Sequence, residues 1–262
     1  MPIADMAGGA IHYTRMGSGK SMIMLLPQSS GPVGSKPFVD CLAERFSIIR
    51  YDQRGIGKSP PPENEKGMTI NARAKEVTGL LDVIGIERTY LCCHSTGCGI
   101  GLALASAEPE RVDALILINP WRCADSYLVT MQEMRIAVAK VLDPYQYSKF
   151  NASILFPPSY RRAHQREFEE LAKRANSLPH DANQIEKRLR AILAFDTRSI
   201  TKDIRCPTLI VTAKDDQLMP DWFGEELAVD IKNAHLVVLE GGGHMLPETR
   251  YNEVFSLIVD FL

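Results

Sequence analysis

The chain has 262 residues and a formal net charge of −2, with 45% hydrophobic and 24% charged residues. These values are typical of a soluble globular protein, and no unbroken apolar run approaches the roughly 18 residues that span a membrane. The balanced charge, without a basic stripe interleaved with aromatic residues, argues against nucleic acid as a partner. The first ten residues, MPIADMAGGA, lack a basic segment followed by an apolar core, so we expect no secretory signal and a cytoplasmic protein.

The six cysteines do not form a disulfide or zinc-binding pattern. Cys92, Cys93 and Cys98 lie in one apolar stretch and the other three are scattered, so we expect small buried thiols. No CxxC pair or histidine cluster has the spacing of zinc ligands. The sequence therefore predicts neither a metal nor a cofactor.

Short apolar runs alternate with helical patterns along the chain. Because most runs lack polar alternation, they predict strands that are buried on both faces, as in right-handed βαβ units of an α/β fold with a mostly parallel sheet. Glycine pairs near the start indicate tight turns and an antiparallel opening. In chain order the expected strands are 10–17, 21–28, 46–53, 89–94, 113–120, 207–214 and 235–242, and the clearest helical stretches are 37–46, 69–85 and 99–112.

This alternation stops after residue 120 and resumes at residue 201. Residues 121–200 contain only helical patterns, so we expect residues 1–120 and 201–262 to form the core and residues 121–200 to form an inserted helical lid. Two apolar stripes with helical spacing predict buried faces. The first consists of Leu128, Met131, Met134, Val138 and Val141, and the second of Ile185, Leu189, Ile192 and Leu193.

The stretch CCHSTGCG, residues 92–99, is typical of a nucleophile elbow, a sharp strand-to-helix turn that carries a nucleophilic serine. Ser95 occupies the apex and Gly97 the small position two residues later. Cys93 stands where the first glycine of G-x-S-x-G is usual. The motif alone leaves open whether Ser95 is a nucleophile or an ordinary serine before a helix, and whether Cys93 or Cys98 acts instead.

Two later loops supply the acid and the histidine that a nucleophilic serine needs. They follow Ser95 in the order Ser, Asp, His that is usual for a nucleophile elbow. Asp215 and Asp216 follow the strand at 207–214, and His244 follows the last strand. In the expected chemistry, His244 takes the proton of Ser95 as general base and the aspartate orients the imidazole. The oxyanion requires two backbone N–H groups, which we expect from Thr96 and Ser29.

These motifs resemble those of the α/β-hydrolase superfamily over nearly the whole chain. RYDQRGIGKS, AEPERVDALILINP, AKDDQLMP and GGGHMLPE carry the resemblance, and YDQRG, INPW, LFPPSY and IRCP are similar to aminoacrylate (carbamate) hydrolases of pyrimidine utilisation and to oxoadipate enol-lactonases. The resemblance implies that Asp216, four residues before Pro220, is the acid. Asn119 occupies the alternative acid position of some relatives, and Pro27-Gln28 replaces the family's His-Gly.

The inserted residues 121–200 carry 13 Lys and Arg against 9 Asp and Glu, whereas the remainder carries 17 against 23. A cationic lid favours an anionic small-molecule substrate. Trp121 and Arg122 are candidate substrate contacts, with Arg161 and Arg162 as further candidates. We expect a hydrolase that cleaves an ester, lactone, amide or enamine-type bond of a small carboxylated metabolite, with a carbon-carbon bond hydrolase or a ligand receptor of the same fold as alternatives.

Overall fold

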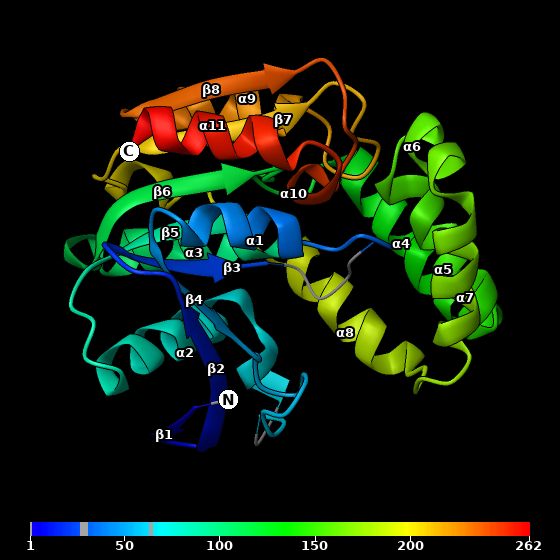
Figure 1. The fold of residues 1–262 in the computed structure, drawn as a ribbon, viewed down its shortest axis with the longest axis horizontal. Coiled ribbons are helices and arrows are strands. Elements are labelled where there is room, and N and C mark those ends of the chain that lie inside the picture. Colours follow the sequence, from blue (N-terminus) through cyan, green and yellow to red (C-terminus); the bar gives the residue numbers. More distant parts are fainter. Residues whose placement is uncertain (1, 27–30, 63–64) are drawn as a thin grey trace.

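The computed structural model describes residues 2–26, 31–62 and 65–262, whose strands form an eight-stranded sheet in the order β1-β2-β4-β3-β5-β6-β7-β8 (Figure 1). β2 pairs antiparallel with β1 and β4, and every other pairing is parallel. The strands are β1 (Ile3–Met6), β2 (Gly9–Met16), β3 (Ser21–Leu25), β4 (Ser47–Tyr51), β5 (Thr89–His94), β6 (Val112–Ile118), β7 (Thr208–Ala213) and β8 (Ala234–Leu239). The expected mostly parallel sheet with an antiparallel opening is therefore confirmed.

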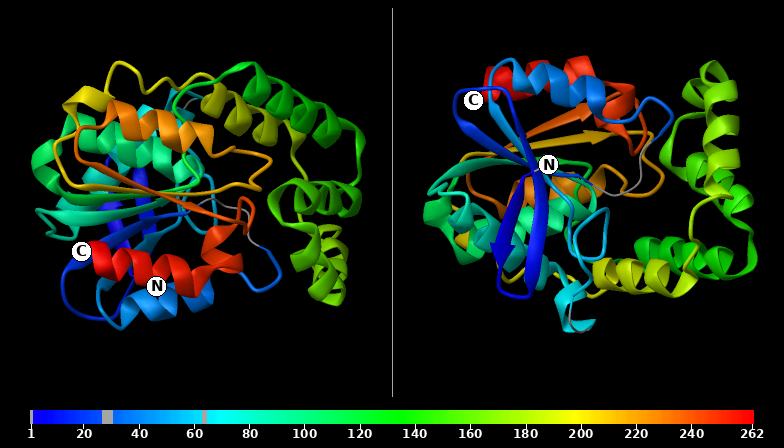
Figure 2. Two further views of the ribbon diagram at one scale, coloured as in Figure 1. Left: turned by 90° about the horizontal axis from the view of Figure 1, so that it is seen from above. Right: turned by 60° about the horizontal axis from the view of Figure 1, so that its bottom comes forward.

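Helices cover both faces of the sheet and create two buried cores (Figure 2). One face carries α1 (Lys36–Ala43), α10 (Leu246–Thr249) and α11 (Tyr251–Phe261), and the other carries α2 (Ile70–Val83), α3 (Thr96–Ala107) and α9 (Trp222–Asp230). Along β5, Leu91 and Cys93 point into one core and Cys92 into the other. This alternation explains why the strand sequence is apolar throughout. Short 3-10 helices span Glu65–Met68, Pro109–Arg111 and Thr201–Asp203.

Five helices are inserted between β6 and β7, and they lie beside the core near the carboxyl ends of the parallel strands (Figures 1 and 2). They are α4 (Ser126–Val141), α5 (Pro144–Leu155), α6 (Pro158–Ala163), α7 (Gln165–Ala175) and α8 (Ala182–Leu193). Asp125, Asp143 and Asp181 accept backbone N–H groups at the starts of α4, α5 and α8. These caps satisfy donors that have no partner inside the helix, so they fix where each helix begins.

The buried face of α4 differs from the expected apolar stripe. Met134 and Val141 are 54% and 81% exposed, so the prediction that they are buried is wrong. The buried face consists of Leu128, Gln132, Arg135, Ile136 and Ala139. Two polar side chains thus replace apolar ones on the face that points inward. The α8 stripe is confirmed, because Leu189 and Ile192 are buried and Ile185 and Leu193 pack against the same core.

All six cysteines are free, in agreement with the expected thiols, although Cys41 and Cys123 are only partly buried. In the described parts of the chain, no helix is long and apolar enough to cross a membrane.

The turn from β5 into α3 is centred on Ser95 and depends on two nearby glycines, Gly97 and Gly101. Ser95 has φ 53° and ψ −123°, a strained conformation for any residue other than glycine. A Cβ at Gly97 would lie 1.8 Å from the carbonyl oxygen of Leu25 in β3, so no side chain fits there. A Cβ at Gly101 would lie 2.4 Å from Sγ of Cys93. Cys93 therefore replaces the usual first glycine because the facing helix position, Gly101, leaves room for its sulfur.

This packing predicts that Gly101→Ala destabilises the wild-type protein by about 1–3 kcal/mol, because the new methyl group clashes with Cys93. In a Cys93→Ala background that clash is removed and the nearest remaining atom is Cδ1 of Leu115 at 3.2 Å, so the same change is expected to cost less than in the wild-type protein by about 1 kcal/mol or more. Urea unfolding of the four proteins in a double-mutant cycle measures the coupling. If Gly101→Ala changes the free energy of unfolding equally in both backgrounds, positions 93 and 101 are not energetically coupled and this explanation of Cys93 is wrong.

Candidate active site

The site lies where neighbouring parallel strands end. Ser95 and Asn119 follow β5 and β6 directly, and the backbone N–H of Ser95 donates to the carbonyl of Ile118 at 3.0 Å. The N–H of Asn119 donates in turn to the carbonyl of Val211 in β7 at 2.8 Å. Ser95 and Asn119 are also the two non-glycine residues with positive φ among those described. The sheet register therefore holds two strained turns side by side at one edge.

Three side chains from separate loops form a continuous hydrogen-bonded chain at this edge. Nε2 of His244 is 2.7 Å from Oγ of Ser95, and Nδ1 of His244 is 2.8 Å from Oδ2 of Asp216. All three residues are at most 5% exposed. The structure thus brings together the serine, histidine and aspartate that the order of the sequence motifs predicts, in the arrangement that a serine nucleophile, a base and an orienting acid require.

Asp216 rather than Asp215 reaches the imidazole. Oδ1 of Asp216 accepts the backbone N–H groups of Leu218 and Met219 at 2.8 and 2.9 Å, while Oδ2 accepts Nδ2 of Asn119 at 2.7 Å. Asp215 instead accepts the N–H of Gly243 at 2.7 Å. Asn119 is thus a site residue that sequence reasoning passed over, because its position was read only as the absence of an acid. Its amide fixes the carboxylate that faces His244.

The loop that carries His244 forms hydrogen bonds with both the core and the insertion. Nε2 of His94 lies 2.7 Å from the carbonyl oxygen of His244, and the N–H of His244 donates to the carbonyl of Leu155 at the end of α5 at 3.0 Å. Because a carbonyl only accepts, Nε2 of His94 carries a proton. Burial, together with the neighbouring His244, lowers the pKa of His94 to about 3. His94 is therefore a buried structural histidine.

Glu248 connects three segments around the site. Its carboxylate accepts the N–H of Gly31 at 2.8 Å and of Val33 at 3.0 Å, and the hydroxyl of Tyr160 in α6 lies 3.3 Å from Oε1. Burial raises the pKa of Glu248, and the backbone donors act in the opposite direction. Glu248 thus fastens the loop after β3 to α10 and to the insertion. Pro27, Gln28 and the expected oxyanion residue Ser29 lie outside the described residues.

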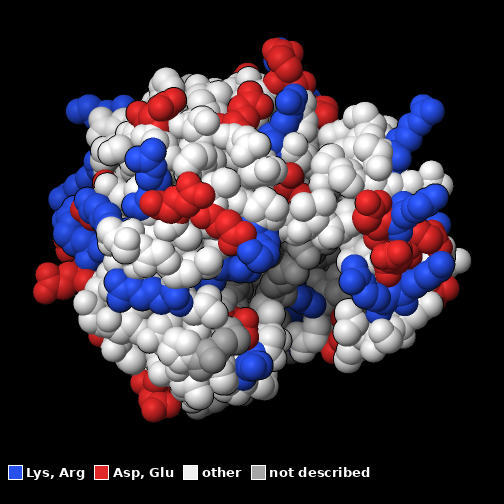
Figure 3. Space-filling view, viewed as in Figure 1, with Lys and Arg blue, Asp and Glu red and all other residues white. Residues whose placement is uncertain are grey.

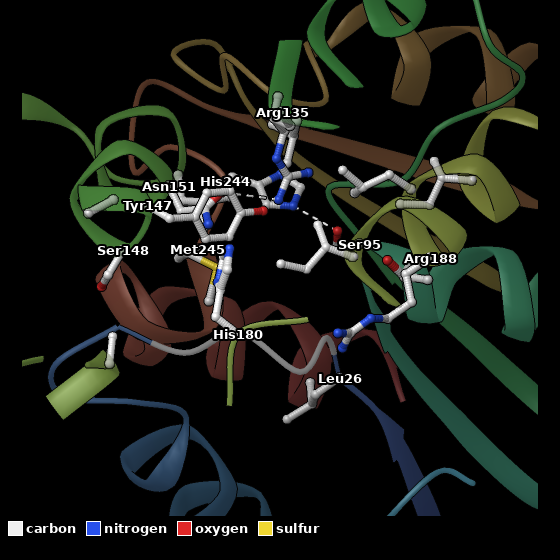
Figure 4. Close-up of a pocket in the computed structure, with 18 of the residues that line it drawn as sticks. Leu26, Ser95, Arg135, Tyr147, Ser148, Asn151, His180, Arg188, His244 and Met245 are labelled. Carbon is white, nitrogen blue, oxygen red and sulfur yellow. Dashed lines mark hydrogen bonds between the residues drawn. The ribbon is translucent and has the colours of Figure 1, made fainter. Parts of the chain in front are cut away.

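A cavity of about 750 Å³ separates the core from the insertion. Ser95, Thr96 and His244 line its core side, and α4, α5, α7 and α8 supply its other walls. The molecular surface is hollowed between these two parts, and basic atoms are visible within the hollow (Figure 3). Residues from both sides face the same space in Figure 4, among them Arg135, Tyr147, Asn151 and His180 from the insertion.

The two expected substrate contacts lie elsewhere. Trp121 is fully buried, where its ring packs against Gly99 and edge-to-face against Phe195. Arg122 forms an ion pair with Asp230 of α9, with Nε 2.6 Å from Oδ2, and its carbonyl accepts both the N–H and the hydroxyl of Thr197. Neither residue lines the described cavity. Both residues connect the start of the insertion to the core and to the end of the insertion. Their partners are distant in the sequence, so the sequence alone does not reveal this role.

Arg161 and Arg162 are likewise not among the described residues that line the cavity. The buried thiols beside Ser95 are poor nucleophiles, since burial raises the pKa of Cys93 and of Cys98 well above the ordinary range. Within residues 2–26, 31–62 and 65–262, no group of three His, Cys, Asp or Glu side chains has a metal-binding arrangement.

Comparisons with known proteins agree with this architecture. The profile of a family described as "alpha/beta hydrolase fold" matches residues 26–251. The "Putative carbamate hydrolase RutD" of Azorhizobium caulinodans is 31% identical over 93% of this chain and 91% of its own, and that of Variovorax paradoxus is 32% identical over 96% of each chain. The crystal structure of the enol-lactonase from Burkholderia xenovorans LB400 superimposes with a TM-score of 0.85 at 24% identity, covering 99% of both chains.

The depressed pKa of His94 predicts a specific loss of stability in acid. His94 binds a proton below about pH 6.5 in the unfolded chain but only near pH 3 in the folded one, so its contribution is present above pH 6.5 and is lost as the pH falls. Between these values the unfolding free energy should fall by about 1.4 kcal/mol per pH unit from this residue alone. His94→Gln keeps a donor for the carbonyl of His244 and removes the titration. Urea unfolding from pH 7 to pH 4 should therefore give a shallower slope for the variant, and parallel curves would refute the assignment.

Proposed function

The chain belongs to the α/β-hydrolase-fold family, and from that premise we propose that it is a serine hydrolase in which Ser95 forms an acyl-enzyme. The observation that carries the proposal is the hydrogen-bonded chain from Asp216 through His244 to Ser95. A buried serine at a strained strand-to-helix turn, with an imidazole on its hydroxyl and a carboxylate on that imidazole, has every group that this chemistry needs.

In the proposed reaction Oγ of Ser95 attacks the acyl carbon and its proton passes to Nε2 of His244. The tetrahedral intermediate collapses as the leaving group departs with that proton, which leaves the acyl group on Ser95. A water molecule then attacks the acyl carbon, gives its proton to His244, and the acid product is released as Ser95 recovers its proton. Asp216, fixed by Asn119 and two backbone donors, keeps the imidazole oriented and stabilises its charged form.

The oxyanion of the intermediate requires two preorganised N–H donors. Thr96 is the first residue of α3, so its N–H has no acceptor within the helix and lies at the positive end of the helix dipole. We assign Thr96 one of the two positions. Ser29 is our candidate for the second, in the loop that Glu248 fastens at Gly31 and Val33.

We assign residues 121–200 the role of a lid that closes the cavity over Ser95 and selects the substrate. The cavity volume of about 750 Å³ suits a small molecule. The excess of basic residues in this segment favours an anionic substrate, and the hydrolase names of the similar proteins support an ester, lactone, amide or enamine-type bond as the one cleaved.

The proposal predicts the kinetics of four variants with a chromogenic ester such as 4-nitrophenyl acetate. Ser95→Ala and His244→Ala should each lower kcat by about a thousandfold or more, since each removes a group that makes or breaks a bond. Asp216→Asn should lower it by about a hundredfold or more through the wrong imidazole tautomer. Cys98→Ala, a neighbouring side chain without a role in the reaction, is the matched control and should stay within about threefold of wild type.

Three results would contradict this proposal. Retained turnover in Ser95→Ala, with loss in Cys98→Ala, would identify a thiol as the nucleophile. Negligible turnover of every ester by the wild-type protein, together with stoichiometric ligand binding, would favour the receptor of the same fold over the enzyme. A preference for dienone acids over esters would instead indicate the carbon-carbon bond hydrolase.

A further inference from the structure

Arg135 is a buried cation on the inward face of α4. Arg135 is 8% exposed. Its guanidinium donates hydrogen bonds to two neutral oxygens, Oε1 of Gln132 at 3.0 Å and Oδ1 of Asn151 at 3.4 Å. Among the described residues no carboxylate is within ion-pair distance of it, and its Nε has no hydrogen-bond partner. Nε2 of Gln132, a fully buried side chain on the same face, is likewise without a partner in the described structure. Hydrogen-bond donors of Arg135 and Gln132 therefore lie together on this face of α4, with no anion beside them among the described residues.

Other buried guanidinium groups of this chain are treated differently. Arg54 and Arg73 share the carboxylate of Glu76, at 3.5 and 3.3 Å, and Arg73 also donates to the carbonyl of Arg54. Burying a charge without a counterion is strongly unfavourable, and burial lowers the pKa of Arg135 accordingly. The fold has therefore supplied one buried cationic cluster with an internal counterion, Glu76, and left Arg135 without one among the described residues.

The position of Arg135 indicates what would compensate it. Arg135 lines the cavity that Ser95 and His244 also line, so a molecule bound there can meet both the guanidinium and the serine hydroxyl (Figure 4). Arginine has five N–H donors in a planar fork that matches a carboxylate, and the two bonds to Gln132 and Asn151 leave donors unused. Asn151 and Tyr147 of α5 line the cavity too and give the site a polar border.

We propose that Arg135 is the specificity-determining residue that binds a carboxylate of the substrate, at the opposite end of the molecule from the bond that Ser95 attacks. The inference deepens the proposed function and rests on it for the identity of the reacting group. It replaces the earlier candidates Arg122, Arg161 and Arg162, none of which lines the described cavity. The substrate is then a small carboxylated acyl compound, held between a fixed cation on α4 and the nucleophile on the core.

A matched pair of esters tests this assignment: 4-nitrophenyl hemisuccinate, which carries a free carboxylate, and its neutral methyl ester. Arg135→Met should lower kcat/KM for the charged ester by about ten- to a hundredfold and leave the neutral ester within about threefold, because only the charged one loses a charge-assisted contact. Lys140→Met is the control, since it removes the same charge from the same helix at a partly exposed pair with Glu186. It should change neither ester by more than about threefold.

Thermal unfolding separates this role from a structural one. Replacing an uncompensated buried charge with an apolar side chain of similar length should leave Tm unchanged or raise it. If Arg135→Met lowers Tm and lowers both esters equally, Arg135 is structural and the inference is overturned. Unchanged kcat/KM for both esters would overturn it as well.

A binding measurement distinguishes failure of this inference from failure of the proposed reaction. Glutarate is titrated calorimetrically into Ser95→Ala and into Ser95→Ala with Arg135→Met, with dimethyl glutarate as the neutral comparison. Binding of glutarate that Arg135→Met abolishes supports the carboxylate site even if no ester is turned over, in which case only the proposed reaction fails. Ester turnover that depends on Ser95, combined with equal glutarate binding to both proteins, overturns the role of Arg135 and leaves the reaction standing.

Discussion

Between β5 and α3 the chain reverses at one residue, Ser95, whose φ of 53° forces the start of the helix against the carbonyl of Leu25 in β3. Strain of this kind costs on the order of 1–3 kcal/mol and persists only where the surroundings determine it completely. Here the surroundings are the parallel register, the absence of a side chain at Gly97, and the space that Gly101 leaves for Cys93. Once this turn forms, the hydroxyl of Ser95 stands beyond the sheet edge where the loops after β7 and β8 deliver Asp216 and His244.

The inserted helices form hydrogen bonds with the segments that carry His244 and Glu248. The carbonyl of Leu155 accepts the N–H of His244, and Tyr160 reaches Glu248, which also holds Gly31 and Val33. The end of α5 and the start of α6 are therefore bonded to the histidine loop, while α4 contributes a cation to the far wall of the cavity. A displacement of this part of the insertion would therefore break a hydrogen bond to the backbone of His244.

The sequence predicts the mostly parallel sheet, because buried apolar runs determine strands. It also predicts that Ser95, Asp216 and His244 lie close together, because they follow strands whose carboxyl ends meet at one edge, and the structure places them within hydrogen-bonding distance. It fails on α4, where apolar spacing favoured Met134 and Val141, whereas the structure buries Gln132 and Arg135. A helix that borders a cavity need not present its most apolar face inward, so the hydrophobic pattern alone misassigns it. Asn119 was missed because its position was read only as the absence of an acid. Glu248 was missed because its partners Gly31 and Val33 are distant in the sequence and only the fold brings them together.

The central claim is that the strained turn presents an activated serine, and covalent labelling tests it most directly. The intact mass of the wild-type protein is measured after treatment with a fluorophosphonate, alongside Ser95→Ala. The account predicts one adduct on the wild-type chain, located on the peptide containing Ser95, and none on the variant. An unlabelled wild-type protein, or an adduct that persists in Ser95→Ala, would contradict the account, because either result would mean that the hydrogen-bonded chain from Asp216 to Ser95 does not activate that hydroxyl.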